Sequence, residues 1–172
     1  MFETGQLVVY GTAGVCRVEG TGQLDPKSPR IYYLLRPLYQ DGLIYAPVGS
    51  DKVSIRPLIS RAEAESLVDL IPTVQAHACR ERTMQLLTQR YQAQLQSGDY
   101  RDLLELIMSI YAKKQEAEQQ RRRLGMVDER YMRQAERLLH GELAAALGIP
   151  YESVPAYIAQ RVQQAKDAQA EA

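Results

Sequence analysis

The chain has 172 residues, of which 45% are hydrophobic, and this is enough apolar material to bury a core in one medium domain or two small ones. Its 21 basic and 21 acidic side chains give a net charge of zero, so phosphate binding would have to come from local clusters of cations. No run approaches the ~18 apolar residues of a membrane span and the start "MFETGQLVVY" does not have the layout of a signal peptide, so we expect a globular cytoplasmic protein with no membrane contact.

The first third of the chain has the pattern of short strands, rich in Val, Ile, Leu and Tyr and separated by Gly and Pro. Five strands are predicted, over residues 6–10, 14–20, 30–38, 43–48 and 52–56. Asp41-Gly42 predicts a tight hairpin between the third and fourth strands, because this dipeptide tolerates the positive φ of such turns. Five short strands in so few residues predict a curled barrel of the SH3 or Tudor type.

Two prolines restrict how this sheet can be paired. Pro37 lies in the third predicted strand and Pro47 at the end of the fourth. Because proline cannot donate a ladder hydrogen bond, both positions are confined to a sheet edge or a strand end. A sheet edge with unpaired backbone groups is either protected or used for docking.

The pattern changes to helical at Ser60. Ser60 and Glu63 have the spacing of a capping box, and Pro72 ends the short helix that they begin. Further helices are predicted over residues 76–96, over 99–121 with Asp99 as N-cap, over 128–147 with Asp128 as N-cap and Gly148 as stop, and after Ser153. The predicted fold is α+β: a β domain over residues 1–60, a connecting helix and linker over 61–75, and an all-α domain over 76–172.

The sequence offers little to an enzyme. It contains no G-x-S-x-G, Walker A, H-E-x-x-H or G-x-G-x-x-G motif, and its two histidines have no matched acid or base at a plausible spacing. Cys16 and Cys79 are far apart, and His77 and Cys79 would lie on different faces of a helix. We therefore expect no catalytic site, no metal and no cofactor.

The stretch "LELIMSIYAKKQEAEQQRRR" begins as an apolar helix face and turns at Tyr111 into a run of Lys, Gln and Arg. At ~100° per residue, Leu103, Ile107 and Ile110 share one face, and Tyr111 lies on the border of that stripe. Border tyrosines commonly pack at the edge of a core with the hydroxyl in water. Periodicity alone therefore leaves Tyr111 as either a core-edge ring or an aromatic that contacts a partner.

Positive charge is concentrated in the middle of the chain. Residues 76–147 carry 12 basic and 10 acidic side chains and are the only net basic part. Any phosphate binding there would be weak and sensitive to salt. Two interpretations remain for the basic residues: they contact phosphates, or they form a solvated face that pairs with Glu116 and Glu118.

Several segments together resemble a known family. "MFETGQLVVYGTAGVCRVEG", "YYLLRP", "LIYAPV" and "VSIRPLIS" are similar to the N-terminal half of the CarD/CdnL bacterial transcription regulators, whose Tudor-like module is shared with transcription-repair coupling factors. "RYQAQLQSGDYRDLLELIMSIY" and "DERYMRQAERLLHGELA" resemble the helical half of that family in the same order. The resemblance covers about residues 1–147.

The resemblance implies an adaptor with two binding surfaces. The β module would dock on the β subunit of RNA polymerase through a sheet edge, and the helical module would contact promoter DNA at the upstream edge of the bubble without strong sequence preference. The predicted polymerase-binding residues are Leu43, Ile44, Tyr45, Ala46 and Pro47. The predicted DNA-binding residues are Tyr111, Lys113, Lys114, Arg90, Arg121, Arg122, Arg123 and Arg130. The protein is expected to act as a monomer.

Two departures from the family bear on these surfaces. The chain contains no Trp, and Tyr111 stands where familiar members place a wedge tryptophan, about a dozen residues after "SGD". Tyr45 occupies a position in the fourth strand that is usually basic, so polymerase contact would depend on backbone pairing and apolar surface. The alternative function is a protein-interaction adaptor whose helical domain does not bind DNA.

Overall fold

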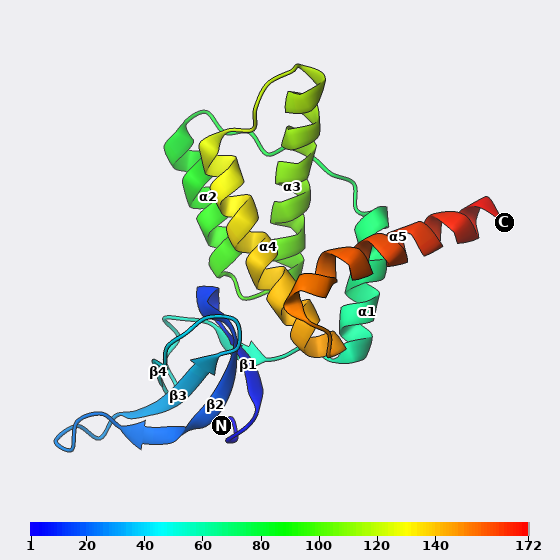
Figure 1. The fold of residues 1–172 in the computed structure, drawn as a ribbon. Helices are drawn as coiled ribbons and strands as arrows, with labels where there is room; N and C mark the ends of the chain where they lie inside the picture. Colours follow the sequence, from blue (N-terminus) through cyan, green and yellow to red (C-terminus); the bar gives the residue numbers. More distant parts are fainter. Residues whose placement is uncertain (172) are drawn as a thin grey trace.

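A sheet module is followed by a helical module in the computed structural model, which describes residues 1–171 (Figure 1). The strands are β1 (Leu7–Tyr10), β2 (Gly14–Gln23), β3 (Ile31–Pro37), β4 (Ile44–Pro47) and β5 (Ile55–Pro57). The helices are α1 (Arg61–Leu70), α2 (Met84–Gln96), α3 (Tyr100–Gln119), α4 (Met126–Leu147) and α5 (Val154–Ala170). Single 3-10 turns lie at Gly11–Ala13, Ile71–Thr73 and Tyr151–Ser153. The predicted α+β class and the order of the two modules are confirmed.

The five strands form one antiparallel sheet in the order β4-β3-β2-β1-β5, so that β4 and β5 are its two edges. The predicted pairing of the third and fourth strands is confirmed, and Gly42 in their connection has a φ of 115°. The turn is not tight, because residues 38–43 separate the end of β3 from the start of β4. The last strand is shorter than predicted and begins only at Ile55. One face of the sheet buries a small core of Val8, Cys16, Val18, Tyr33, Leu35 and Ala46. Burial raises the pKa of the Cys16 thiol to about 11, so this cysteine is an inert packing residue.

The capping box predicted for α1 is present. The Glu63 N–H donates to Ser60 Oγ over 3.1 Å, and the Ser60 N–H donates to the Glu63 carboxylate over 2.9 Å. The buried face of α1, which includes Leu67, packs into one cluster with Leu143 of α4 and Val154 at the start of α5. This packing makes α1 a structural part of the helical module.

Two predicted helix starts are wrong. The helix predicted from residue 76 begins at Met84, because the Thr83 side chain caps it and the Cys79 N–H donates to Ser109 Oγ, which holds the preceding segment against α3. The helix predicted from Asp128 begins at Met126, with Gly125 as N-cap. The Asp128 carboxylate does not cap a helix and is instead buried against α2 and α3. Capping spacing in the sequence could not distinguish a cap from a buried acceptor.

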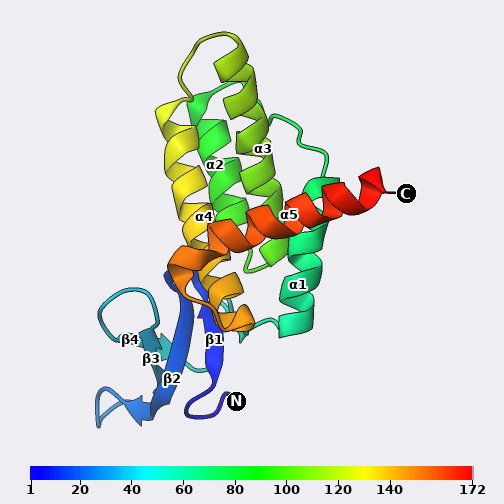
Figure 2. The same cartoon turned by 45° about the vertical axis from the view of Figure 1, so that its right-hand side comes forward.

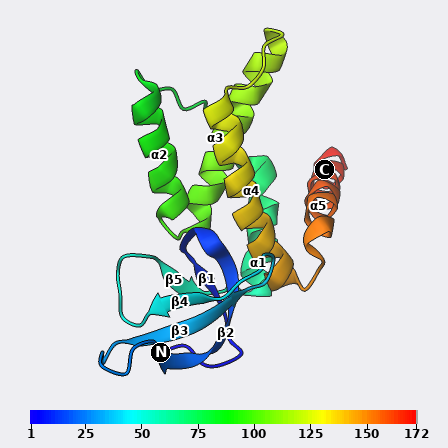
Figure 3. The same cartoon turned by 60° about the vertical axis from the view of Figure 1, so that its left-hand side comes forward.

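The two modules are in contact through the C-terminal half of α4, which lies beside the sheet (Figures 2 and 3). The approach is close: a Cβ added at Gly141 of α4 would lie 3.2 Å from the ring of Tyr39. The same Tyr39 ring lies 5.2 Å from that of Tyr151, just after α4. Among residues 1–171, no helix combines the length and the hydrophobicity that a membrane span requires.

Candidate docking edge and nucleic-acid interface

The edge strand β4 presents backbone groups that the sheet does not use. The Val48 N–H donates to the Ile31 carbonyl over 3.0 Å, and this hydrogen bond identifies which residue pairs of the β3–β4 ladder are hydrogen-bonded. Because paired positions alternate in an antiparallel ladder, the backbone groups of Ile44 and Ala46 face β3 and those of Tyr45 face outward. A strand added to this edge would therefore pair at Tyr45.

The side chains of β4 divide the predicted docking residues into two kinds. Tyr45 is 45% exposed and Leu43 is also exposed, whereas Ala46 is 1% exposed and belongs to the sheet core. Ile44 and Pro47 are half-buried. Ala46 therefore offers neither its side chain nor its backbone groups to a docked partner, and Tyr45 offers the largest accessible side chain.

The opposite edge, β5, lies against the helical module. The guanidinium of Arg56 in β5 donates to the carbonyl of Gly98 in the connection between α2 and α3. Ser54, just before β5, lies so close to Gly98 that a Cβ at that glycine would collide with it. The edge left for an external strand is therefore β4, which lies at the other end of the strand order from β5 (Figure 1).

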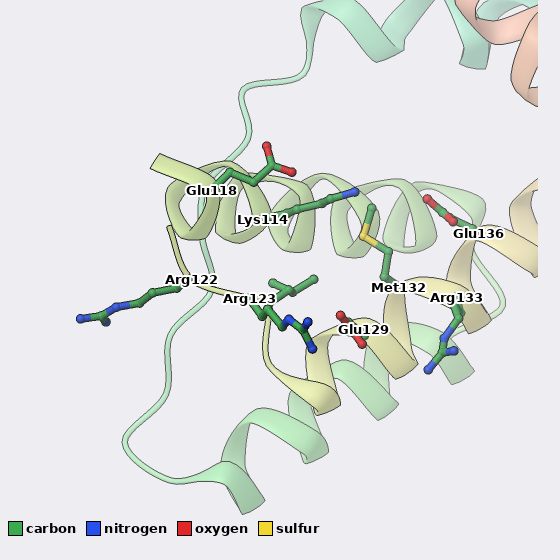
Figure 4. Close-up of a pocket in the computed structure, with 9 residues that line it drawn as sticks. Lys114, Glu118, Arg122, Arg123, Glu129, Met132, Arg133 and Glu136 are labelled. Carbon is green, nitrogen blue, oxygen red and sulfur yellow. The ribbon is translucent and has the colours of Figure 1, made fainter. Parts of the chain in front are cut away.

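A groove of about 610 Å³ lies between α3, the 120–125 connection and α4 (Figure 4). Its charged lining consists of Lys114, Arg122, Arg123 and Arg133 together with Glu118, Glu129 and Glu136. Arg123 points toward Glu129, whereas Arg122 extends away from the groove. The groove is therefore of mixed sign, with four cations and three carboxylates.

Tyr111 lies on the surface of α3 and is 42% exposed. The Gln115 side-chain amide donates to its hydroxyl oxygen over 3.1 Å. Lys114 and Glu118, which line the groove, follow Tyr111 at three and seven residues and so share its face of the helix. The ring is thus a half-exposed aromatic beside the groove rather than a buried core residue.

The chain leaves α3 through a left-handed turn at Arg121, whose φ is 55°. The Arg122 N–H donates to the Ala117 carbonyl over 2.7 Å and the Arg121 N–H to the Glu118 carbonyl over 3.1 Å. This is the hydrogen-bond pattern of a Schellman motif, in which glycine usually occupies the left-handed position. The turn reverses the chain and brings Arg122 and Arg123 to the end of the groove.

The comparison with known families concerns the sheet module. Residues 2–59 match the CarD-like/TRCF RID domain, and the match ends just before α1. The sheet module is a CarD-like/TRCF RID domain. Such a domain interacts with RNA polymerase, so the chain is an RNA polymerase-interacting, transcription-related protein, and the predicted family is confirmed for the sheet module. No curated protein matches the chain.

Lys113, predicted to face DNA together with Lys114, is instead turned inward. Its Nζ lies 3.0 Å from Asp128 Oδ1 and donates to the Tyr91 hydroxyl over 3.2 Å, with only 11% of its side chain exposed. Tyr91 in turn donates to Asp128 over 2.6 Å. Burial and this hydrogen bond raise the pKa of Tyr91, which keeps the phenol protonated as a donor. Lys113 thus joins α2, α3 and α4 and does not belong to the surface set.

Arg90 and Arg130, outside the RID domain, do not line the groove either. Arg90 on α2 pairs with Glu81 over 3.1 Å and lines a separate cavity with Cys79 and Arg80. Arg130 lies over the ring of Tyr131, 5.0 Å from its centroid. Of the predicted cations, Lys114, Arg122 and Arg123 thus lie along the groove, with the end of the Arg122 side chain extending away from it.

Sequence reasoning missed the α4 side of the groove. Glu129, Met132, Arg133 and Glu136 line it at spacings of three and four, which is the signal of one helix face. That face could have been recognised by pairing the predicted helices across their short connection. In the alternative interpretation the basic run pairs with Glu116 and Glu118, but in the structure Glu116 binds Arg80. No group of three or more His, Cys, Asp or Glu among residues 1–171 is arranged to hold a metal ion.

Proposed function

We propose that this chain is a bacterial transcription regulator that binds the β subunit of RNA polymerase through β4. In this proposal its helical module contacts promoter DNA at the upstream edge of the bubble and tunes the stability of the open complex. The observation that carries the proposal is the half-exposed Tyr111 beside Lys114, on a module joined to a polymerase-interacting domain. The site of action is then the cytoplasm, and neither catalysis nor a cofactor is required.

The role proposed for Tyr111 follows from its chemistry. An aromatic ring placed at a distorted base step stabilises the opened shape by stacking or insertion. Every base has a π-face, so this contact is tolerant of sequence. Lys114, Arg122 and Arg123 supply phosphate contacts, which position the protein but carry little sequence information.

The mixed charge of the groove explains why polymerase binding is needed. Three carboxylates line the groove beside the cations, so the free chain has little electrostatic attraction for DNA. Docking the RID domain on polymerase makes the DNA contact effectively intramolecular, and tethering can raise the apparent affinity by 10² to 10⁴. Polymerase docking and the DNA contact together then hold the helical module on the promoter, which neither contact would do alone.

We expect Tyr45→Asp to weaken binding to polymerase by about tenfold or more, because docking at β4 would bury a carboxylate without a partner. The side chain is exposed in the free protein, so the domain should stay folded. Ile44→Asp is the less clean variant, since Ile44 packs against the sheet core. A pull-down with isolated β subunit measures the effect.

The matched control for this prediction is Leu24→Asp. Leu24 is another exposed apolar residue and lies in the β2–β3 connection, outside β4. The Leu24→Asp variant should bind polymerase with the same affinity as the parent chain. Undiminished binding by Tyr45→Asp, with a normal melting curve, would remove β4 from the interface.

A salt series tests the DNA contact and with it the proposed function. Lys114→Ala should weaken promoter binding in the presence of polymerase about equally on unrelated sequences and flatten the plot of log K against log salt by about 1. Lys166→Ala, on α5 and outside the groove, is the control and should leave the slope unchanged. Losses that depend on sequence would instead indicate base readout.

A second candidate function is favoured by the three carboxylates of the groove. In that case the chain is a protein-interaction adaptor whose RID domain binds polymerase and whose helical module binds no DNA. The same salt series separates the two functions. An adaptor would give identical salt slopes for the parent chain, Lys114→Ala and a complex of polymerase and promoter alone.

A further inference from the structure

The strongest link between the two modules is an ion pair. Both terminal nitrogens of Arg56, on β5, donate to the Glu142 carboxylate on α4, over 2.6 and 2.7 Å. Glu142 is 1% exposed and Arg56 is largely buried. The third guanidinium nitrogen, Nε, donates to the Gly98 carbonyl between α2 and α3. One side chain of the RID domain is thus fixed at three points to two parts of the helical module.

The packing around this pair leaves α4 little freedom to rotate relative to the sheet. Gly14 in β2 lies against Leu138 of α4, where an added Cβ would be 3.3 Å from a methyl carbon. One turn further, Gly141 lies against the ring of Tyr39. Burial lowers the pKa of Arg56, but the hydrogen bond and charge of Glu142 outweigh it and raise the pKa overall. The charges of the Arg56–Glu142 pair, the geometry of its two hydrogen bonds and the close packing at Gly14 and Gly141 therefore all fix the position of α4 on the sheet.

The groove and Tyr111 lie far from this link. A small rotation of α4 at the link therefore produces a large displacement of the groove. About 13 residues of α4 separate Glu142 from Glu129 in the groove, which is roughly 20 Å at 1.5 Å per residue. A rotation of roughly 10° about the link would move the groove by about 3.5 Å over that length. Such a displacement is larger than the tolerance of a stacked ring or a bidentate phosphate contact, because each depends on contact distances of a few ångströms.

We propose that Arg56 and Glu142 are positioning residues that fix the angle between the polymerase-docked RID domain and the DNA-facing groove, and so set the lifetime of the open complex. This inference rests on the proposed function. Neither residue touches DNA or the β4 edge in this proposal. Their effect is to convert polymerase docking into a fixed position of Tyr111 at the bubble.

The test variant is Glu142→Gln. It removes the charge but keeps the shape, and the Arg56 that remains can reach water because 22% of its side chain is exposed. Removing Arg56 instead would leave a carboxylate that is 1% exposed without a partner, which is the more destabilising change. Arg56→Lys is the second variant, because lysine keeps the charge but loses the two-pronged geometry.

Two readouts on the full chain distinguish positioning from folding. Spin labels at Arg17→Cys in β2 and Gln119→Cys at the end of α3, in a Cys79→Ser background, report the distribution of distances between the modules. The distribution should be narrow in the parent chain and broad in both variants. Open-complex half-life should fall several-fold, while the affinity for polymerase stays within twofold of the parent chain.

Asp69→Asn is the matched control. Asp69 forms a two-pronged pair with Arg161, between α1 and α5, within the helical module alone. It should change neither the distance distribution nor the half-life. A narrow distribution in folded Glu142→Gln or Arg56→Lys, or a broad one with an unchanged half-life, overturns the inference. Failure of the proposed function is seen separately, as a parent chain that does not alter open-complex half-life.

Discussion

Replacing Asp128 with alanine is expected to lower the free energy of unfolding of the helical module by about 3–5 kcal/mol. The carboxylate accepts hydrogen bonds from both Lys113 and Tyr91, and its removal leaves a largely buried ammonium without a counter-charge and a buried hydroxyl without its acceptor. Breaking one member of a buried ion pair costs this much because the other charge stays desolvated. Urea unfolding followed by helical circular dichroism measures the change.

Two comparisons make this prediction specific. Asp69→Ala removes the carboxylate of an exposed ion pair and should cost less than about 1 kcal/mol. The triple change Tyr91→Phe, Lys113→Met and Asp128→Leu replaces the whole buried network with apolar groups of similar size and should recover much of the loss. A cost below about 1 kcal/mol for Asp128→Ala would show that the network contributes little to stability.

Tyr111→Ala is expected to shorten the open-complex half-life strongly while leaving the free energy of unfolding within about 1 kcal/mol of the parent chain. The ring is 42% exposed, so its removal does not open an enclosed cavity. Alanine also has the higher helix propensity, which offsets part of the lost contact. Tyr111→Trp should fold normally and maintain or lengthen the half-life, because the larger ring stacks better.

Gln115→Ala is the control for Tyr111. It removes the hydrogen bond to the Tyr111 hydroxyl and leaves the ring in place. It should have only a small effect on half-life if stacking of the ring is what matters. A loss of roughly 3 to 5 kcal/mol for Tyr111→Ala, with Tyr111→Trp also destabilised, would return Tyr111 to the core and end its assignment as a DNA contact.

Local chemistry explains what could be predicted about the fold. Asp41-Gly42 predicted the β3–β4 hairpin, since few dipeptides accept the turn geometry. Ser60 with Glu63 predicted the start of α1, because both hydrogen bonds of a capping box join residues three apart. The false start at Asp128 arose because an acceptor suited to a helix N-terminus is equally suited to a buried lysine.

The candidate sites were predictable only in part. The order of weak motifs predicted the polymerase-interacting domain and the sheet edge that includes Tyr45. Both were predictable because short strands and their turns depend on residues that are close together in the sequence. Tyr111 was ambiguous, since a helix border can face either the core or the solvent. Its exposure depends on which neighbouring helices cover that border, and residues near in sequence do not contain this information.

The sequence alone determined the α+β class, the order of the two modules, the hairpin and the family of the first sixty residues, all of which follow from residues close together along the chain. Tertiary structure alone decided that Lys113 turns inward while Lys114 faces the groove, and that Arg56 binds Glu142, 86 residues away. The reason is physical: the position of a charge depends on partners brought by other helices and strands, and the cost of burying it can be assessed only once those partners are in place.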